Sequence, residues 1–161
     1  MGPSLVLTAM TKADAEFVAR LAADERVTAY IGDGHTWSHE YTAQRVDHAL
    51  LNAGICWYIA RRQNSPVGLF TATERPAATE IGYWIDPEFW GQGLAKSLVG
   101  KGLATLQAEG RSALIARVDS ANIASLKVLK RHGFIAQAKE GPGLITLTRA
   151  MPAEPIPASG G

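Results

Sequence analysis

Hydrophobic positions along this chain alternate between a period of two residues and a period of about 3.6 residues. Runs rich in β-branched and aromatic residues predict strands at residues 5–8, 55–62, 67–73, 79–85, 113–118, 134–138 and 144–149. Amphipathic stretches with polar capping residues predict helices at 12–23, 24–31, 38–52, 94–109 and 123–132. This order of elements predicts an α/β protein with a mixed sheet of about seven strands and helices on both faces.

A glycine-rich loop stands between the strand at 79–85 and the helix at 94–109. It reads Trp90-Gly-Gln-Gly-Leu-Ala, and Gly91 and Gly93 allow positive φ and a close approach of the backbone to a bulky group. The N–H groups of the first helical turn have no partner inside the helix, and the helix dipole favours an anion there. The sequence therefore predicts a phosphate-binding loop at this point.

A second strand and helix follow at 113–132, where Asn122 is expected to cap the helix and Gly133-Phe134 to end it. Glu80-Ile-Gly-Tyr, Trp90-Gly-Gln-Gly-Leu-Ala and Asn122-x-x-Ser125 together resemble the GNAT superfamily of N-acetyltransferases. The motif Tyr-Trp-Ile-x-Pro-Glu-x-Trp-Gly-x-Gly resembles sequences of the branch that acetylates the N-termini of ribosomal proteins. The resemblance is dense over residues 79–134 and looser over residues 4–73.

The resemblance implies the GNAT fold, with acetyl-CoA bound where the strands 79–85 and 113–118 splay apart. Its pyrophosphate would rest on the amides of the glycine loop, and its pantetheine arm would pair with freed backbone as an added strand. The residues expected to bind this co-substrate are Trp84, Ile85, Gly91, Gln92, Gly93, Leu94, Ala95, Lys96, Asn122 and Ser125.

One position departs from the family pattern, which usually has Arg or Gln where this chain has Trp90. A phosphate contact from that side chain is therefore not expected, and the backbone amides of the loop are expected to supply more of the hydrogen bonds to the phosphate. Lys96 either compensates with its charge or is an ordinary surface lysine.

Glu80 is the candidate general base, because it is an acidic residue in an otherwise apolar strand beside the expected splay. Partial burial there would raise the pKa of its carboxyl group toward neutrality. The resemblance agrees, since a Glu at this place is the base in histone-acetylating members. A water molecule bridged by backbone carbonyls is the alternative base.

The general acid is harder to assign. Many family members have a Tyr seven residues after the Asn, where this chain has Leu129, which has no proton to donate. Ser125 lies one turn after Asn122 on the same side of the helix. Its hydroxyl either donates to the leaving sulfur of coenzyme A or positions the pantetheine arm.

The acceptor amine is expected near residues 33–41, where Asp33, His35, Trp37 and Tyr41 cluster on a loop and a helix start. The aromatic side chains would form a wall, and Asp33 would attract a cationic amine. His35 and His39 have a loop between them and no apparent third ligand, so no metal site is expected.

Several aromatic, aliphatic and basic residues complete the expectations for packing. Trp57, Tyr83 and Trp84 are expected mainly in the core, as are Ile123, Leu126 and Leu129 on the helix at 123–132. Arg61 and Arg62 are expected in a solvated turn.

Composition narrows the class of protein. The 161 residues suit one domain over 1–150, followed by a tail at 151–161 that is rich in Pro, Gly and Ser and expected to be disordered. A net charge of +1 argues against nucleic acid or an acidic membrane as partner. The single Cys56 and the lack of a signal or membrane-spanning segment favour a cytoplasmic protein. The assembly is expected to be either a monomer or a homodimer.

These features predict an acetyl-CoA-dependent N-acetyltransferase that transfers the acetyl group directly to a primary amine, either a peptide N-terminus or a small molecule. A non-catalytic acyl-CoA-binding sensor with the same fold is the alternative, which Leu129 favours and Glu80 disfavours. A P-loop is not expected, because Lys-Ser/Thr does not directly follow the last glycine of the loop, as the pattern Gly-x-x-x-x-Gly-Lys-Ser/Thr requires.

Overall fold

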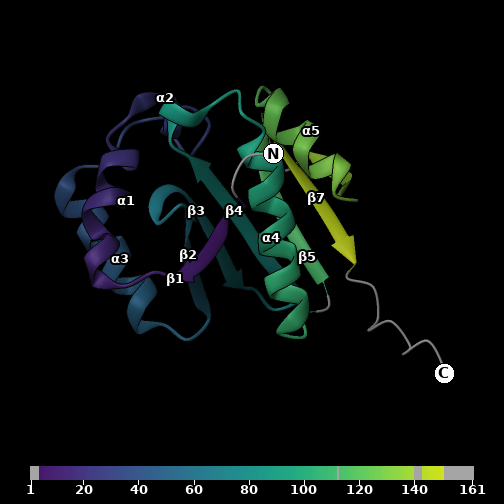
Figure 1. Cartoon of the computed structure of the whole chain (residues 1–161). Coiled ribbons are helices and arrows are strands. Elements are labelled where there is room, and N and C mark those ends of the chain that lie inside the picture. Colours follow the sequence, from purple (N-terminus) through teal and green to yellow (C-terminus); the bar gives the residue numbers. More distant parts are fainter. Residues whose placement is uncertain (1–3, 112, 140–142, 151–161) are drawn as a thin grey trace.

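The computed structural model describes residues 4–111, 113–139 and 143–150 (Figure 1). The helices, with two 3₁₀ turns, are η1 (Lys12–Asp14), α1 (Ala15–Ala22), α2 (Glu25–Thr28), α3 (His39–Leu51), η2 (Pro87–Phe89), α4 (Leu94–Ala108) and α5 (Ile123–Arg131). The strands are β1 (Val6–Ala9), β2 (Ile55–Arg62), β3 (Ser65–Glu74), β4 (Thr79–Ile85), β5 (Ala113–Asp119), β6 (Ile135–Lys139) and β7 (Leu144–Ala150). Every helix and strand predicted from the sequence is present, and α2 is shorter than the predicted 24–31. The expected tail at 151–161 lies outside the described residues.

Local sequence explains where several of these elements begin. Ser38 caps α3, because its hydroxyl accepts a hydrogen bond of 3.0 Å from the Tyr41 N–H. The turn between β2 and β3 is formed by Gln63 and Asn64, both with positive φ, as a two-residue hairpin turn requires.

The strands form one mixed sheet in the order β1-β2-β3-β4-β5-β7-β6, counted over the described residues. The two central strands, β4 and β5, run parallel and pair only at Thr79 with Leu114 and at Glu80 with Ile115. Beyond Glu80 the two strands separate, although each continues for several residues. The predicted splay between the strands 79–85 and 113–118 is therefore confirmed.

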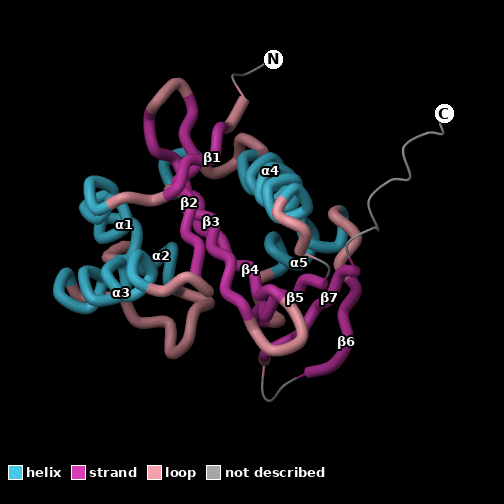
Figure 2. Tube along the Cα trace, turned by 90° about the horizontal axis from the view of Figure 1, so that it is seen from below, coloured by secondary structure: helices cyan, strands magenta, loops and turns pink. Residues whose placement is uncertain are grey.

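Helices cover both faces of the sheet, as predicted. Figure 2 shows α1, α2 and α3 on one face of the strands, and α4 and α5 on the other. Residues of β4 divide between two cores: Ile81 and Ile85 pack in the core on the α4 side, whereas Trp84 packs in the core formed with α1 and α3. Because strand side chains alternate, Glu80 and Gly82 share the face of Trp84.

Helix α4 lies unusually close to the sheet at one point. A Cβ atom built on Gly102 would come within 2.3 Å of the ring of Phe70, a residue of β3 that is fully buried. Glycine at this position therefore sets the distance between α4 and the sheet.

Two packing expectations are wrong. Ile123 is 56% exposed, because it occupies the outer face of the first turn of α5, which no element of the described residues covers. Arg61 and Arg62 are not in a turn but at the end of β2, where their side chains reach η1 and the glycine loop. Arg61 Nη2 lies 2.5 Å from Asp14 Oδ1, and Arg62 Nη1 donates to Gln92 Oε1 over 2.9 Å.

None of the helices within the described ranges is both long and apolar enough to cross a membrane.

Candidate active site

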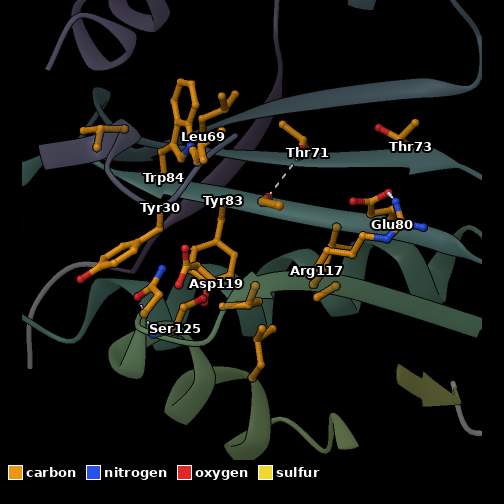
Figure 3. A pocket seen from close by; sticks show the side chains of 18 of the residues that line it. Tyr30, Leu69, Thr71, Thr73, Glu80, Tyr83, Trp84, Arg117, Asp119 and Ser125 are labelled. Carbon is orange, nitrogen blue, oxygen red and sulfur yellow. Dashed lines mark hydrogen bonds and ion pairs between the residues drawn. The ribbon is translucent and has the colours of Figure 1, made fainter. Parts of the chain in front are cut away.

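A cavity of about 350 Å³ opens where β4 and β5 separate. This volume lies within the range of small-molecule sites. Figure 3 shows side chains from both strands and from α5 converging on it. Of the residues predicted to act in the site, the cavity is lined by Trp37, Glu80, Trp84, Asn122 and Ser125.

The position of this cavity follows from the topology. In a parallel pair the carboxyl ends of both strands reach the same edge, and there β4 leads into the glycine loop and β5 leads into α5. The N-termini of α4 and α5 therefore both lie at the open end of the splay. Ligands of α/β sheets bind at this end of the strands.

Glu80 lies on the cavity wall with its side chain 21% exposed. Its carboxylate accepts a hydrogen bond of 2.9 Å from Arg75 Nε, and Arg117 Nη1 lies 3.7 Å from the same oxygen. Glu80 is partly buried, as expected, but its neighbours are charged, because alternation brings Arg117 of β5 to the same face and the β3–β4 turn contributes Arg75. Charge, rather than apolar burial, surrounds this carboxylate.

Tyr83 and Ser125 form a pair of hydroxyl groups on the opposite face of the splay. The Tyr83 hydroxyl and Ser125 Oγ are 2.6 Å apart, and either group can be the donor. Burial raises the pKa of Tyr83, while the hydrogen bond from Ser125 acts in the opposite direction. Tyr83, expected mainly in the core, lines the cavity with its polar end.

The start of α5 holds Ser125 in place. Asn122 Oδ1 accepts a hydrogen bond of 3.2 Å from the Ser125 N–H, so Asn122 caps α5 as predicted. Both side chains line the cavity, and so does Leu129, which is fully buried. An apolar side chain thus stands one turn beyond the hydroxyl pair.

The glycine loop has the backbone geometry that its sequence predicts. Gly91 has φ of 82° and Gly93 has φ of 74°, and no atom lies within 4 Å of a Cβ built on either residue. Within the described part of the chain, the N–H groups of residues 91–96 have no hydrogen-bond acceptor. The loop and the first turn of α4 therefore present a row of free donors.

Side chains of the loop are used to anchor it. Gln92 is held by Arg62, whose guanidinium also lies over the ring of Phe89 at 5.1 Å. The Trp90 indole N–H donates to the Ile85 carbonyl over 2.9 Å, so this nitrogen is engaged with β4. Lys96 is exposed in the first turn of α4, beside the buried Leu94 and the half-buried Ala95. The loop residues lie outside the cavity itself.

Of the four residues predicted to bind the acceptor, only Trp37 lines the cavity. Trp37 contacts both Tyr41 and Trp84 edge-on, with ring centroids 5.1 Å apart in each pair. Asp33 and His35 are exposed and contact each other at 3.0 Å, away from the cavity lining. Acceptor binding by Asp33, His35 and Tyr41 stays a prediction.

Several residues that line the cavity were not assigned a role in the site from the sequence, namely Tyr30, Arg45, Arg75, Tyr83 and Arg117. Arg117 had a signal, because it is a charged residue in an otherwise apolar strand, on the face opposite Ala116. No sequence pattern marked Arg45 or Arg75, because Arg45 reaches the cavity from α3 and Arg75 reaches it from the turn between β3 and β4.

Comparison with known proteins agrees with this geometry. Residues 4–135 match the family model described as an acetyltransferase (GNAT) domain, and the chain belongs to this family. It is 32% identical over 146 residues to YoaA of Bacillus subtilis (strain 168), an uncharacterized N-acetyltransferase, covering 85% of this chain and 81% of that protein.

Solved structures share the fold at low sequence identity. The spermidine N-acetyltransferase of Vibrio cholerae, in complex with CoA and spermine, superposes with a TM-score of 0.80 at 16% identity over 91% of this chain and 95% of its own. An acetyltransferase of Salmonella typhimurium that modifies the N-terminal serine of ribosomal protein L7/L12 superposes with a TM-score of 0.79 at 20% identity, over 92% and 96% of the two chains.

Family and site together make this chain an acetyl-CoA-dependent N-acetyltransferase, with acetyl-CoA as its co-substrate and an amine as its acceptor. The comparisons give no support to the non-catalytic sensor considered from the sequence.

Proposed function

We propose that this protein transfers the acetyl group of acetyl-CoA directly to an α-amine or a small-molecule primary amine, with both substrates bound together at the splay. The observation that carries the proposal is the opening between β4 and β5 directly after Glu80. A carboxylate lines one side of this opening and the Tyr83–Ser125 hydroxyl pair lines the other.

The chain offers acetyl-CoA two sets of main-chain partners. The free N–H groups of residues 91–96 suit the diphosphate, because a helix N-terminus favours an anion. The edge of β4 beyond Glu80, at Trp84 and Ile85, has no β5 partner and suits the amides of the pantetheine arm. Asn122 and Ser125 would contact the same arm from α5.

The acceptor amine must lose its proton before it attacks, and the chemical class of amine decides the cost. At pH 7 an α-amine costs about 1 kcal/mol to deprotonate, whereas a lysine amine costs about 4–5 kcal/mol. Holding two reactants in position can supply about 7–11 kcal/mol. An α-amine therefore needs only a weak base, a role that we assign to Glu80, directly or through one water molecule.

Transfer forms the amide C–N bond and breaks the thioester C–S bond, leaving a thiolate that takes up a proton. We assign this donation to the Ser125 hydroxyl, which Tyr83 can resupply across 2.6 Å. Since burial raises the pKa of Tyr83, this phenol keeps its proton at neutral pH. The assignment replaces the tyrosine that the family usually has at the position of Leu129.

The proposed compartment is the cytoplasm, and the proposed assembly is a monomer or a homodimer. The lone, half-buried Cys56 supports a reducing compartment, since it has no second cysteine to pair with. Neither nucleic acid nor a membrane is proposed as a partner.

The test is acetylation of a mixed library of peptides and small amines, read by mass spectrometry with acetyl-CoA as donor. The expected result is a mass gain of about 42 Da on a subset of the primary amines, because one acetyl group replaces one amine hydrogen in the direct transfer described above. If CoA binds and no amine is modified, the protein is an acyl-CoA sensor and the proposal fails.

A further inference from the structure

The face of the splay that would receive the acceptor carries an excess of positive charge. Among the described residues that line the cavity, three are arginines and two are carboxylates: Arg45, Arg75, Arg117, Glu80 and Asp119. Alternation along β4 and β5 supports a common face for Glu80, Arg117 and Asp119, opposite the side covered by α4.

Both carboxylates are already engaged. Glu80 is bonded to Arg75 and contacted by Arg117. Asp119 accepts a hydrogen bond of 2.8 Å from the Ala121 N–H in the turn before α5. Two guanidinium groups therefore offset the negative charge of Glu80, and the cavity lining keeps a net positive charge.

Arg45 is the least neutralised of these groups. No carboxylate lies within ion-pair distance of its guanidinium in the described part of the chain. Its guanidinium instead lies over the ring of Trp37, 5.8 Å from the centroid. A cation–π contact holds a guanidinium in place without neutralising it.

A smaller cavity of about 140 Å³ extends this basic surface along α3. It shares Arg45, Trp57, Thr73 and Arg75 with the main cavity and adds His48. Its described lining contains two arginines and a histidine and no carboxylate. Arg75 uses Nε for Glu80, and its Nη atoms make no hydrogen bond within the described residues.

We infer that this side cavity, walled by Arg45, His48 and Arg75, binds a carboxylate of the acceptor, so that the substrate is an amine with an acidic group nearby rather than a polyamine. The inference rests on the proposed transfer at the splay. Arginine suits this role, because its guanidinium binds a carboxylate through two parallel hydrogen bonds. The carboxylate belongs either to an acidic residue close to a peptide N-terminus or to a free amino acid.

The test compares acceptors that differ only in charge, with acetyl-CoA saturating. One arm uses peptides that begin Ser-Glu, Ser-Gln and Ser-Lys, a second uses free glutamate against its diamide, and a third uses spermidine. We expect kcat/KM to be about tenfold higher for the acidic member of whichever pair is accepted, the effect of one charge-assisted hydrogen bond. The arm that responds identifies the source of the carboxylate.

Variants locate the effect. Arg45→Gln should lower the acidic-to-neutral ratio of kcat/KM about tenfold, mainly through KM, and Arg45→Lys should restore part of it. Arg131→Gln is the matched control, because Arg131 is an exposed arginine on α5 that lines neither cavity. Its ratio should equal that of the wild type.

Two outcomes overturn the inference while leaving the transferase proposal intact: equal or better use of the neutral, lysine-containing or polyamine acceptors, or an unchanged ratio in Arg45→Gln. Acetyl-CoA binding without acetylation of any acceptor overturns both.

Discussion

Arg75 Nε donates a hydrogen bond of 2.9 Å to the Glu80 carboxylate, across the turn that joins β3 to β4. A hydrogen bond between a guanidinium and a carboxylate is stronger than a neutral one, so this contact holds the Glu80 side chain in position. Glu80 is thus fixed on the cavity wall by a neighbour five residues away.

Replacing Glu80 by Gln should lower kcat about 100-fold, because a positioned general base contributes about 10²–10⁴ to a rate. Acetyl-CoA binding should change little, since Glu80 lies on the acceptor face. Steady-state kinetics and calorimetric binding of CoA give the two values.

The matched control for this variant is Glu74→Gln. Glu74 belongs to the neighbouring strand and pairs with Arg111, outside the main cavity. Activity of Glu80→Gln close to that of Glu74→Gln would contradict the role of Glu80 and favour a water molecule bridged by backbone carbonyls.

Removing the hydroxyl pair tests proton donation to the thiolate. Tyr83→Phe and Ser125→Ala should each lower kcat about tenfold, and the double variant should lose little more, because the two hydroxyls act as one relay. Thioesters with a more acidic thiol should restore part of the rate in both variants. Strictly additive losses with no restoration would indicate that the two groups act separately.

Alkaline pH should destabilise the protein through two tyrosines. Burial raises the pKa of Tyr58 and of Tyr83, and the hydrogen bond from Tyr58 to Glu109 adds to the effect at Tyr58. A raised pKa in the folded state means that stability is complete below the ordinary pKa of about 10 and is lost as pH rises beyond it. Urea unfolding between pH 8 and 11 should show the decline, and Tyr58→Phe should make it shallower.

Gly93→Val should weaken CoA binding at least about tenfold, because a side chain at this φ strains the loop and blocks the approach of a phosphate. Gly110→Val is the matched control, since Gly110 has φ of 80° and open space around it at the far end of α4. Both variants should lose similar stability in thermal melts. Equal CoA affinity in the two would show that the loop does not bind the diphosphate.

Gly102→Ala should destabilise the fold by about 1–3 kcal/mol, because the new methyl group overlaps the buried ring of Phe70. Gly100→Ala lies on the same helix, and its Cβ would meet His132 Nε2 only at 3.4 Å. Helix propensity should make that control neutral or more stable by up to about 1 kcal/mol. Denaturant unfolding at one pH ranks the three proteins.

The sequence predicts the fold well because its signals are local. The Ser38 cap, the glycines at 91 and 93, and the alternation along β4 each depend on a few consecutive residues. The splay was inferred through family resemblance, and it is confirmed by the two pairs that join β4 to β5. The exposure of Ile123 was missed, because periodicity gives a helix face without saying which other elements reach it.

The chemistry of the site was less accessible to sequence. Arg117 lies 37 residues from Glu80, and Ser125 lies 42 residues from Tyr83, so no local pattern joins either pair. Tyr83 looked like a core residue because its strand is apolar. Arg62, expected in a solvated turn, instead holds Gln92, which lies 30 residues away in the glycine loop and comes near only in the folded protein.

Because β4 and β5 pair at only two positions, the sheet consists of two parts, β1–β4 and β5–β7, that are joined at one end. A metabolite that binds along both free edges would hold the two parts together. Its binding would raise the free energy of unfolding by about 2.7 kcal/mol at a concentration 100 times its Kd. Resistance to proteases and the lifetime of the protein in a cell would then rise and fall with the supply of acetyl-CoA.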